Sequence, residues 1–182
     1  MRNKHIFAIA VTLLLIAAVA HLLTHQQRTA MVHPPASGSQ NVYTPQPQAK
    51  TSGCVAVNNL PDLTCTPGAV IASATKDQIC VSGYSRTVRH VPVAEKDAVY
   101  AEYGIPSHVP GEYEVDHLIS LELGGSNDIA NLWPEAANPT PGFHQKDAFE
   151  NELHAKVCAG TISLAEAQKE IASNWLQYYN AR

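Results

Sequence analysis

Residues 113–134 read YEVDHLISLELGGSNDIANLWP, and this segment determines the predicted fold. Its first part is β-like and ends in the pair Asp116 and His117. The run Gly-Gly-Ser-Asn-Asp that follows is typical of a turn that reverses the chain. Residues 131–134 form a second short extended segment, which leads through a proline-rich loop to a helix. Strand, turn, strand and helix would together bring Asp116 and His117 to the polar face of that helix.

Two helices are predicted downstream from the spacing of their apolar residues. In residues 144–157, Phe149, Leu153 and Val157 recur every four residues and form one apolar stripe. The second helix begins with Ser-Leu-Ala-Glu at residues 163–166, a capping-box pattern that satisfies backbone donors at a helix start. Its inner face has core spacing and no cluster of reactive groups, so we expect a structural role for Leu164, Ala167, Ile171 and Trp175.

The stretch before the central segment is predicted to be less regular. Residues 54–74 are rich in turn-forming residues, and residues 80–93 intersperse Val and Tyr with polar residues, as β-strands do. Residues 95–103 predict a short helix that ends at Gly104, because glycine readily adopts the left-handed conformation that follows helix ends.

The N-terminal sequence predicts that the protein is exported from the cytoplasm. A positively charged start, Met-Arg-Asn-Lys, precedes an apolar run at residues 6–20, as in a secretory signal peptide. If the run extends to Leu23, it is also close to the length of a membrane anchor. Residues 1–24 are therefore a signal peptide or anchor, and the remainder would be periplasmic, secreted, or anchored facing outward. Residues 25–53, rich in Gln, Ser, Thr and Pro, predict a flexible linker, which leaves residues 54–182 as the domain.

The four cysteines agree with an exported protein, because an even number suits disulfide pairing in an oxidising compartment. Three pairings are possible. We favour Cys54 with Cys65, which closes a short loop, and Cys80 with Cys158, which joins an early segment to a late helix. A zinc site is the competing interpretation, but none of the spacings is C-x-x-C.

The charge excludes one way of binding nucleic acid. The chain has 12 Lys and Arg against 16 Asp and Glu, a net charge of −4, and without the two cations of the leader the balance is 10 against 16, or −6. A protein that holds nucleic acid through a broad basic surface is not acidic. A nucleic-acid substrate would therefore have to be held locally.

The central segment resembles the HNH endonuclease motif in its Asp-His pair, its Gly-Gly-Ser-Asn turn, its Asn-Leu pair and the helix that follows. Lys146 and Asp147 with Glu150, followed by Leu-His and Val-Cys, resemble a secreted bacterial subgroup of that superfamily. The resemblance is strongest over residues 112–175 and weaker over residues 80–89. It implies an α+β fold with a ββα-metal core, an additional N-terminal β and loop segment, and a C-terminal helix, stapled by disulfides.

The resemblance also implies roles for individual residues. His117 would be the general base, since a neutral imidazole can take a proton from water at physiological pH. Asp116 would bind one divalent metal ion, and Asn131 would tie the loop so that His117 points correctly. The third metal-site residue stays open between His144, Asn138 and Glu150. Carboxylate and amide ligands favour Mg²⁺ or Mn²⁺, whereas two histidines would admit Zn²⁺ or Ni²⁺.

Three cations are candidates for contact with the substrate: Lys146, Arg86 and Arg89. Each could equally be an ordinary solvated surface charge. With this set we expect a hydrolase that cleaves DNA rather than RNA, with low sequence specificity, because no basic recognition helix is present. Two alternatives remain: an inactive HNH-like domain that binds nucleic acid or another partner at the cell surface, and a disulfide-stapled structural domain whose histidines bind metal without catalysis.

Overall fold

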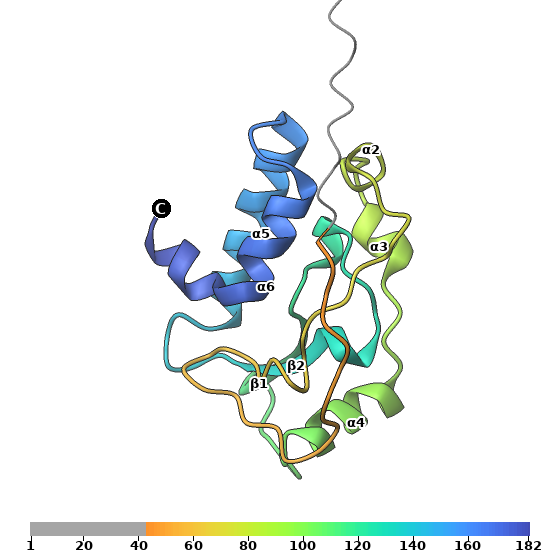
Figure 1. Cartoon of the computed structure of the whole chain (residues 1–182). Coiled ribbons are helices and arrows are strands. Elements are labelled where there is room, and N and C mark those ends of the chain that lie inside the picture. The colour runs from red at the N-terminus through yellow and green to blue at the C-terminus, as the bar shows by residue number, and fades with distance from the viewer. Residues whose placement is uncertain (1–42) are drawn as a thin grey trace, which may run out of the picture. The chain divides into compact units, whose positions relative to one another are not determined.

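The computed structural model describes residues 43–182, which form an α+β unit with one two-stranded sheet and five helices (Figure 1). The predicted leader and most of the predicted linker lie outside the described residues. Within residues 43–182, no helix is both long enough and apolar enough to cross a membrane.

The predicted strand pair is confirmed. β1 (Tyr113–His117) and β2 (Leu132–Ala136) are antiparallel, with His117 opposite Leu132 at one end of the ladder. The connection contains two 3-10 turns, η1 (Leu121–Leu123) and η2 (Ile129–Asn131). The candidate base therefore stands at the end of a strand, where the chain leaves the sheet.

The two adjacent glycines of the connection are required for different reasons. Gly124 follows η1 with a φ of +74°, a left-handed conformation that side chains disfavour. At Gly125, a Cβ atom would lie 1.7 Å from the carbonyl oxygen of Ile119. The chain can fold back this tightly only because neither position carries a side chain.

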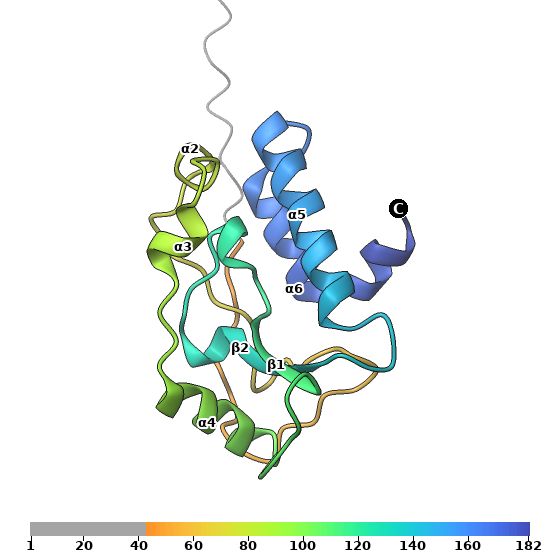
Figure 2. The same cartoon turned by 180° about the vertical axis from the view of Figure 1, so that it is seen from behind.

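Helices α5 (Phe143–Ala159) and α6 (Leu164–Asn180) confirm the two downstream predictions and lie side by side in both views (Figures 1 and 2). Ser163 caps α6 by accepting a hydrogen bond from the Glu166 amide at 3.1 Å. The larger core cluster lies mainly between these helices and η1, and its fully or nearly fully buried members include Ile119, Leu123, Phe149, Leu153, Val157, Ala167, Ile171 and Trp175.

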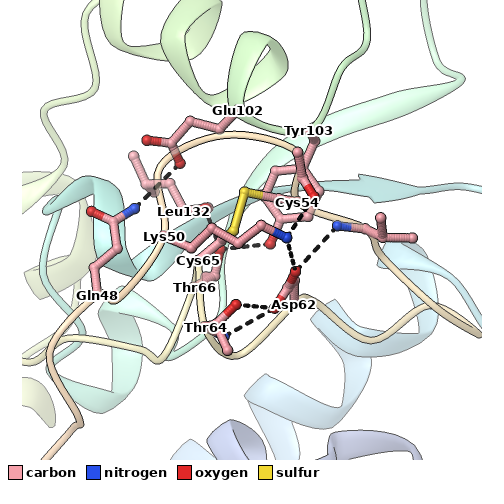
Figure 3. The surroundings of a disulfide bond; sticks show 12 residues. Gln48, Lys50, Cys54, Asp62, Thr64, Cys65, Thr66, Glu102, Tyr103 and Leu132 are labelled. Atoms are coloured by element: carbon pink, nitrogen blue, oxygen red, sulfur yellow. Dashed lines mark hydrogen bonds and ion pairs between the residues drawn. A yellow bond between two sulfur atoms is a disulfide. The ribbon is translucent and has the colours of Figure 1, made fainter.

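A second, smaller core cluster surrounds the Cys54–Cys65 disulfide, which packs beside Tyr103 (Figure 3). The cluster also includes Leu118 and Trp133. The Tyr103 hydroxyl lies 2.7 Å from Thr66 Oγ1, and Thr66 in turn donates to the carbonyl of Leu132 at 3.0 Å. The disulfide loop is thus fastened to β2, beside the strand end that carries the site.

The prediction of β-structure for residues 80–93 is wrong. These residues follow α2 (Lys76–Ile79), contain α3 (Tyr84–Val88) and lead into α4 (Val93–Glu102). Thr75 and Gln78 form a reciprocal capping box at the start of α2, and Gly83, at a φ of +83°, separates α2 from α3. The helix predicted over residues 95–103 is confirmed as α4.

Both predicted disulfides are confirmed, Cys54–Cys65 and Cys80–Cys158, and they are consistent with an extracellular or otherwise oxidising environment. The folded unit also begins earlier than the predicted boundary at residue 54. The amides of Ala49 and Lys50 both donate to the carbonyl of Thr64, at 2.9 and 3.0 Å. The last part of the predicted linker is therefore bonded to the domain.

Candidate active site

Asn131 holds the loop that follows His117. Its Oδ1 accepts hydrogen bonds from the amides of Ile119 at 2.9 Å and Ala69 at 3.2 Å. Its Nδ2 donates to the carbonyls of Ile119 at 3.0 Å and Ser126 at 2.8 Å. Because the side chain is fully buried and both of its ends are bonded, it fixes the backbone immediately after the Asp-His pair.

His117 is almost fully buried, and its Nε2 lies 3.2 Å from Oδ1 of Asn127. The Asn127 amide is itself oriented, because Oδ1 also accepts from the His90 amide at 3.0 Å and Nδ2 donates to the Val88 carbonyl at 2.7 Å. An amide oxygen only accepts, so Nε2 is the protonated nitrogen of the neutral ring and Nδ1 is the basic one.

His117 is held in the neutral form that can accept a proton, as a weaker base than a free imidazole. Burial lowers its pKa to about 4, although the nearby Asp116 carboxylate and the Asn127 hydrogen bond oppose this change. The ring is therefore neutral at physiological pH and can accept a proton.

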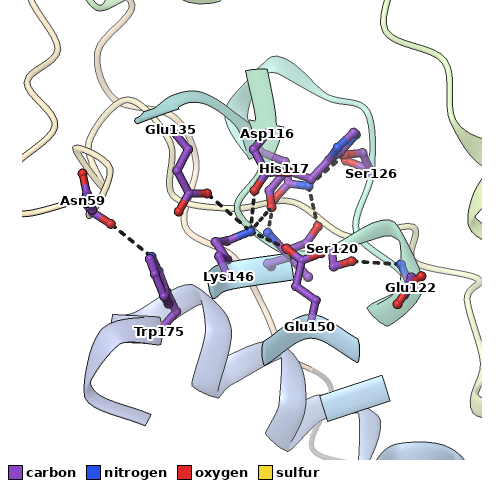
Figure 4. A network of polar contacts seen from close by, with 12 residues as sticks. Asn59, Asp116, His117, Ser120, Glu122, Ser126, Glu135, Lys146, Glu150 and Trp175 are labelled. Carbon is purple, nitrogen blue, oxygen red and sulfur yellow. Dashed lines mark hydrogen bonds and ion pairs between the residues drawn. The ribbon is translucent and has the colours of Figure 1, made fainter. Parts of the chain in front are cut away.

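Beneath His117 lies a buried cluster of charges centred on Lys146 of α5 (Figure 4). The Lys146 ammonium donates to Asp116 Oδ2 at 2.6 Å, to the His117 carbonyl at 2.8 Å, and to Glu150 Oε1. The carboxylate of Glu135 on β2 is 3.9 Å away. Lys146 thus bridges β1 and α5, and it touches both residues of the Asp-His pair.

The ionisation of the cluster is uneven. Burial opposes a charge on Asp116, but the Lys146 ammonium and a hydrogen bond from Glu135 together outweigh burial and lower the pKa of this carboxyl. Burial raises the pKa of Glu135 well above its usual value and raises that of Glu150 to about 7. The pKa of Lys146 is raised, because the three surrounding carboxyl groups outweigh its own burial. At neutral pH the ionised core of the cluster is therefore the Asp116–Lys146 pair.

A cavity of about 370 Å³ opens beside His117. Two cations from the segment between α3 and α4 and from α4 itself, Arg89 and Lys96, line it. Its other walls include the rings of Tyr100, Tyr113 and Phe143. His117 thus lines a cavity together with two cations, the carboxyl group of Glu114 and three aromatic rings.

The remaining candidates lie outside the cluster. His144 is exposed on the first turn of α5, Asn138 is exposed in the loop before α5, and Arg86 is exposed on α3. In the described part of the chain, none of these three forms a hydrogen bond or ion pair with Asp116 or His117. Asp147 lies within electrostatic range of both Asp116 and His144, so the start of α5 is on the Asp116 side of the site.

A second group with metal-ligand chemistry is already used covalently. Cys80, His154 and Cys158 place their ligand atoms within 4.8 Å of one another. The two cysteines form a disulfide, and His154 Nε2 lies 3.0 Å from the carbonyl of Ile79. This group is therefore a covalent and hydrogen-bonded link between α2 and α5.

Two residues of the site were assigned differently from the sequence. Asn127 was predicted as a turn former, yet it contacts His117; no sequence signal distinguishes the two roles. Lys146 is predicted from the sequence to contact the substrate or to be a solvated surface charge, yet it is fully buried and its ammonium is bonded within the protein. The burial of Lys146 could be predicted from the sequence, because residue 146 falls on the same helical stripe as Phe149, Leu153 and Val157.

Comparisons with known protein families, with curated proteins and with solved structures find no match to this chain. Its function therefore has to be argued from the chemistry of its own side chains. These are a buried neutral imidazole, a carboxylate paired with a buried ammonium, and a cavity with cationic and aromatic walls.

Proposed function

We propose that this chain is an exported, divalent-metal-dependent endonuclease of the HNH (ββα-metal) type that hydrolyses DNA with low sequence specificity. The observation that carries the proposal is the arrangement around His117. A neutral imidazole stands at the end of β1, in a strand–turn–strand–helix unit, and it faces the cavity that Arg89 lines. The four hydrogen bonds of Asn131 fix the backbone behind it.

The donor atoms near His117 suit a hard divalent cation such as Mg²⁺ or Mn²⁺. Asp116 and Glu150 both bond the Lys146 ammonium, which lowers the pKa of Asp116 and so keeps this carboxyl ionised beside His117. Carboxylate oxygens are the ligands that such ions prefer. Asp116 would hold the ion, with a further ligand from His144, Asn138 or Glu150. When bound, the ion supplies charge neutralisation at the scissile phosphate and at the leaving oxygen.

The protein's own groups would divide the remaining work. Nδ1 of His117 takes the proton from the attacking water, while Asn127 keeps the other ring nitrogen protonated. Lys146 orients the Asp116 carboxylate and the His117 carbonyl at the same time. Arg89, on the cavity wall, is placed to neutralise a phosphate oxygen.

The test is cleavage of supercoiled plasmid by the oxidised protein, in EDTA and then with Mg²⁺, Mn²⁺, Ni²⁺ or Zn²⁺. We expect nicking that depends on a divalent ion and that falls by about a hundredfold or more in His117→Ala, the range of general-base catalysis. Lys169→Ala is the control, since this lysine is exposed on α6. A folded wild-type protein that cleaves neither DNA nor RNA with any ion would overturn the proposal and favour a binding module.

A further inference from the structure

The cavity beside His117 has features that general phosphodiester cleavage does not require. Its lining includes two cations, Arg89 and Lys96, and one carboxyl group, Glu114. None of the ion pairs within the described residues involves Arg89 or Lys96, although Arg89 lies within electrostatic range of Glu114. The part of the chain after the predicted leader has a net charge of −6, so its surface is not basic overall. The presence of two cations at one cavity is therefore a local feature. Two cations against one carboxyl group leave the cavity lining with an excess of positive charge, which is suited to phosphate oxygens.

The aromatic residues that line this cavity also contact a ring outside it. The ring of Tyr100 packs on that of His108 at 4.4 Å between centroids, and His108 meets the edge of Tyr113 at 6.2 Å. Tyr100 and His108 also line a second cavity of about 710 Å³. The two hollows therefore share Tyr100, and a row of rings passes from one to the other.

Building on the proposed nuclease function, we propose that this cavity binds a nucleotide of an unpaired nucleic-acid strand. Arg89 and Lys96 hold its phosphate, and its base stacks against Tyr100 or Tyr113. A volume of about 370 Å³ falls within the range of about 300–1,000 Å³ that small-ligand pockets occupy. Stacking on aromatic side chains is tolerant of base identity, because every base has a π-face.

The same geometry explains why a paired strand is the poorer ligand. A base in a duplex is stacked on its neighbours and paired, so it enters a cavity only after leaving the helix, which costs free energy. An unpaired base carries no such cost. The protein should therefore prefer single strands, frayed ends and gaps over intact duplex.

The experiment measures binding of fluorescein-labelled (dT)₈ and of a blunt hairpin duplex by anisotropy, in EDTA and at low salt. We expect (dT)₈ to bind at least about fivefold more tightly than the duplex. Arg89→Ala and Lys96→Ala should each weaken binding several-fold and flatten its salt dependence, since each removes one phosphate contact. Tyr100→Leu should raise the Kd about fivefold or more, whereas Tyr100→Phe, which keeps the ring, should stay within twofold of wild type.

Lys169→Ala is the matched cation control, and melting curves show whether each variant is folded. Equal binding of single strand and duplex, or Arg89→Ala and Lys96→Ala binding like Lys169→Ala, would overturn the inference. The plasmid assay on the same samples separates the two proposals. Metal-dependent nicking without selective (dT)₈ binding removes only the cavity assignment, whereas selective binding without nicking by any ion removes only the nuclease.

Discussion

Replacing Lys146 by Met tests the buried charge cluster most directly. The substitution keeps much of the apolar stem and removes the ammonium, whose three N–H groups are all used, by Asp116, Glu150 and the His117 carbonyl. Two carboxyl groups and one carbonyl would then be buried without their donor. Breaking a buried ion pair from one side costs about 3–5 kcal/mol, because the other charge remains buried and uncompensated.

We therefore expect Lys146→Met to lose about 4 kcal/mol of unfolding free energy at pH 7.5, a change of about a thousandfold in the unfolding equilibrium. The melting temperature should fall by roughly 10 °C or more. Urea unfolding, followed by the fluorescence of the buried Trp133 and Trp175, measures the loss. Lys169→Met, at an exposed position on α6, should stay within about 0.5 kcal/mol of wild type.

The pH dependence of this difference has a defined sign. In the wild type the pKa of Asp116 is lowered, so its contribution is lost only as the pH falls below the unfolded value of 3.8 and is nearly constant between pH 7.5 and pH 5. In the variant, burial without the ammonium raises the pKa values of Asp116 and Glu150, so the variant gains stability as the pH falls. The gap between the two proteins should narrow from pH 7.5 to pH 5. A gap below about 1 kcal/mol at pH 7.5 would refute the role of Lys146 as the stabilising cation.

Three further predictions follow from the bonds described above. Asn131→Ala should lower the free energy of unfolding by about 3 kcal/mol or more, as measured by thermal melting, and abolish nicking, because it leaves buried backbone groups unpaired. A loss below about 1 kcal/mol would argue against the role of Asn131 in fixing the loop. Burial raises the pKa of Tyr103 to about 12, so its contribution to the free energy of unfolding is full below pH 10 and is lost as the pH rises through 12. In urea unfolding at pH 11.5, the wild type should therefore lose about 2 kcal/mol that Tyr103→Phe does not lose. An equal loss in both proteins would contradict this. At a sequence separation of 78 against 11, the Cys80–Cys158 disulfide should contribute about 4.5 kcal/mol and Cys54–Cys65 about 2.8 kcal/mol, as measured with paired Cys→Ser variants. The reverse order would be inconsistent with chain entropy as the main term.

The elements that the sequence predicts correctly are those whose signals are local. The glycine pair fixes the reversal between β1 and β2, and Ser163 marks the start of α6 by its own side-chain hydrogen bond. The apolar stripe of α5 is visible because its residues recur at helical spacing. In each case the residues that form the structure are also the residues that carry the signal.

The failure over residues 80–93 has the opposite cause. Tyr84–Val88 carries side chains that favour strands, and a helix of five residues has little intrinsic stability. α3 packs against η1, and its Val88 carbonyl accepts a hydrogen bond from Asn127, 39 residues away. Contacts distant in sequence decide this conformation. The capping box at Thr75 and Gln78 was the one local indication of a helix nearby.

The sequence predicts which residues form the candidate site, but not which contacts they make with one another. Asp116 and His117 could be selected because the pair ends a predicted strand and, together with the glycine turn and Asn131, resembles the HNH motif. Whether Asp116 faces solvent or a buried ammonium depends on how α5 packs, and that is set by the core behind it. A lysine within an apolar stripe predicts a buried partner, and Glu150, four residues later, is the partner on the same helix.

The Cys80–Cys158 disulfide turns the middle of the chain into a covalent ring, and the site residues from Arg89 to Glu150 all belong to it. Residues 106–112 form an exposed stretch of that ring. A protease that cuts once there opens the ring but releases nothing: the piece with Arg89 and the piece with His117 stay joined through sulfur. The cut protein therefore migrates as one chain until it is reduced, and only then separates into two.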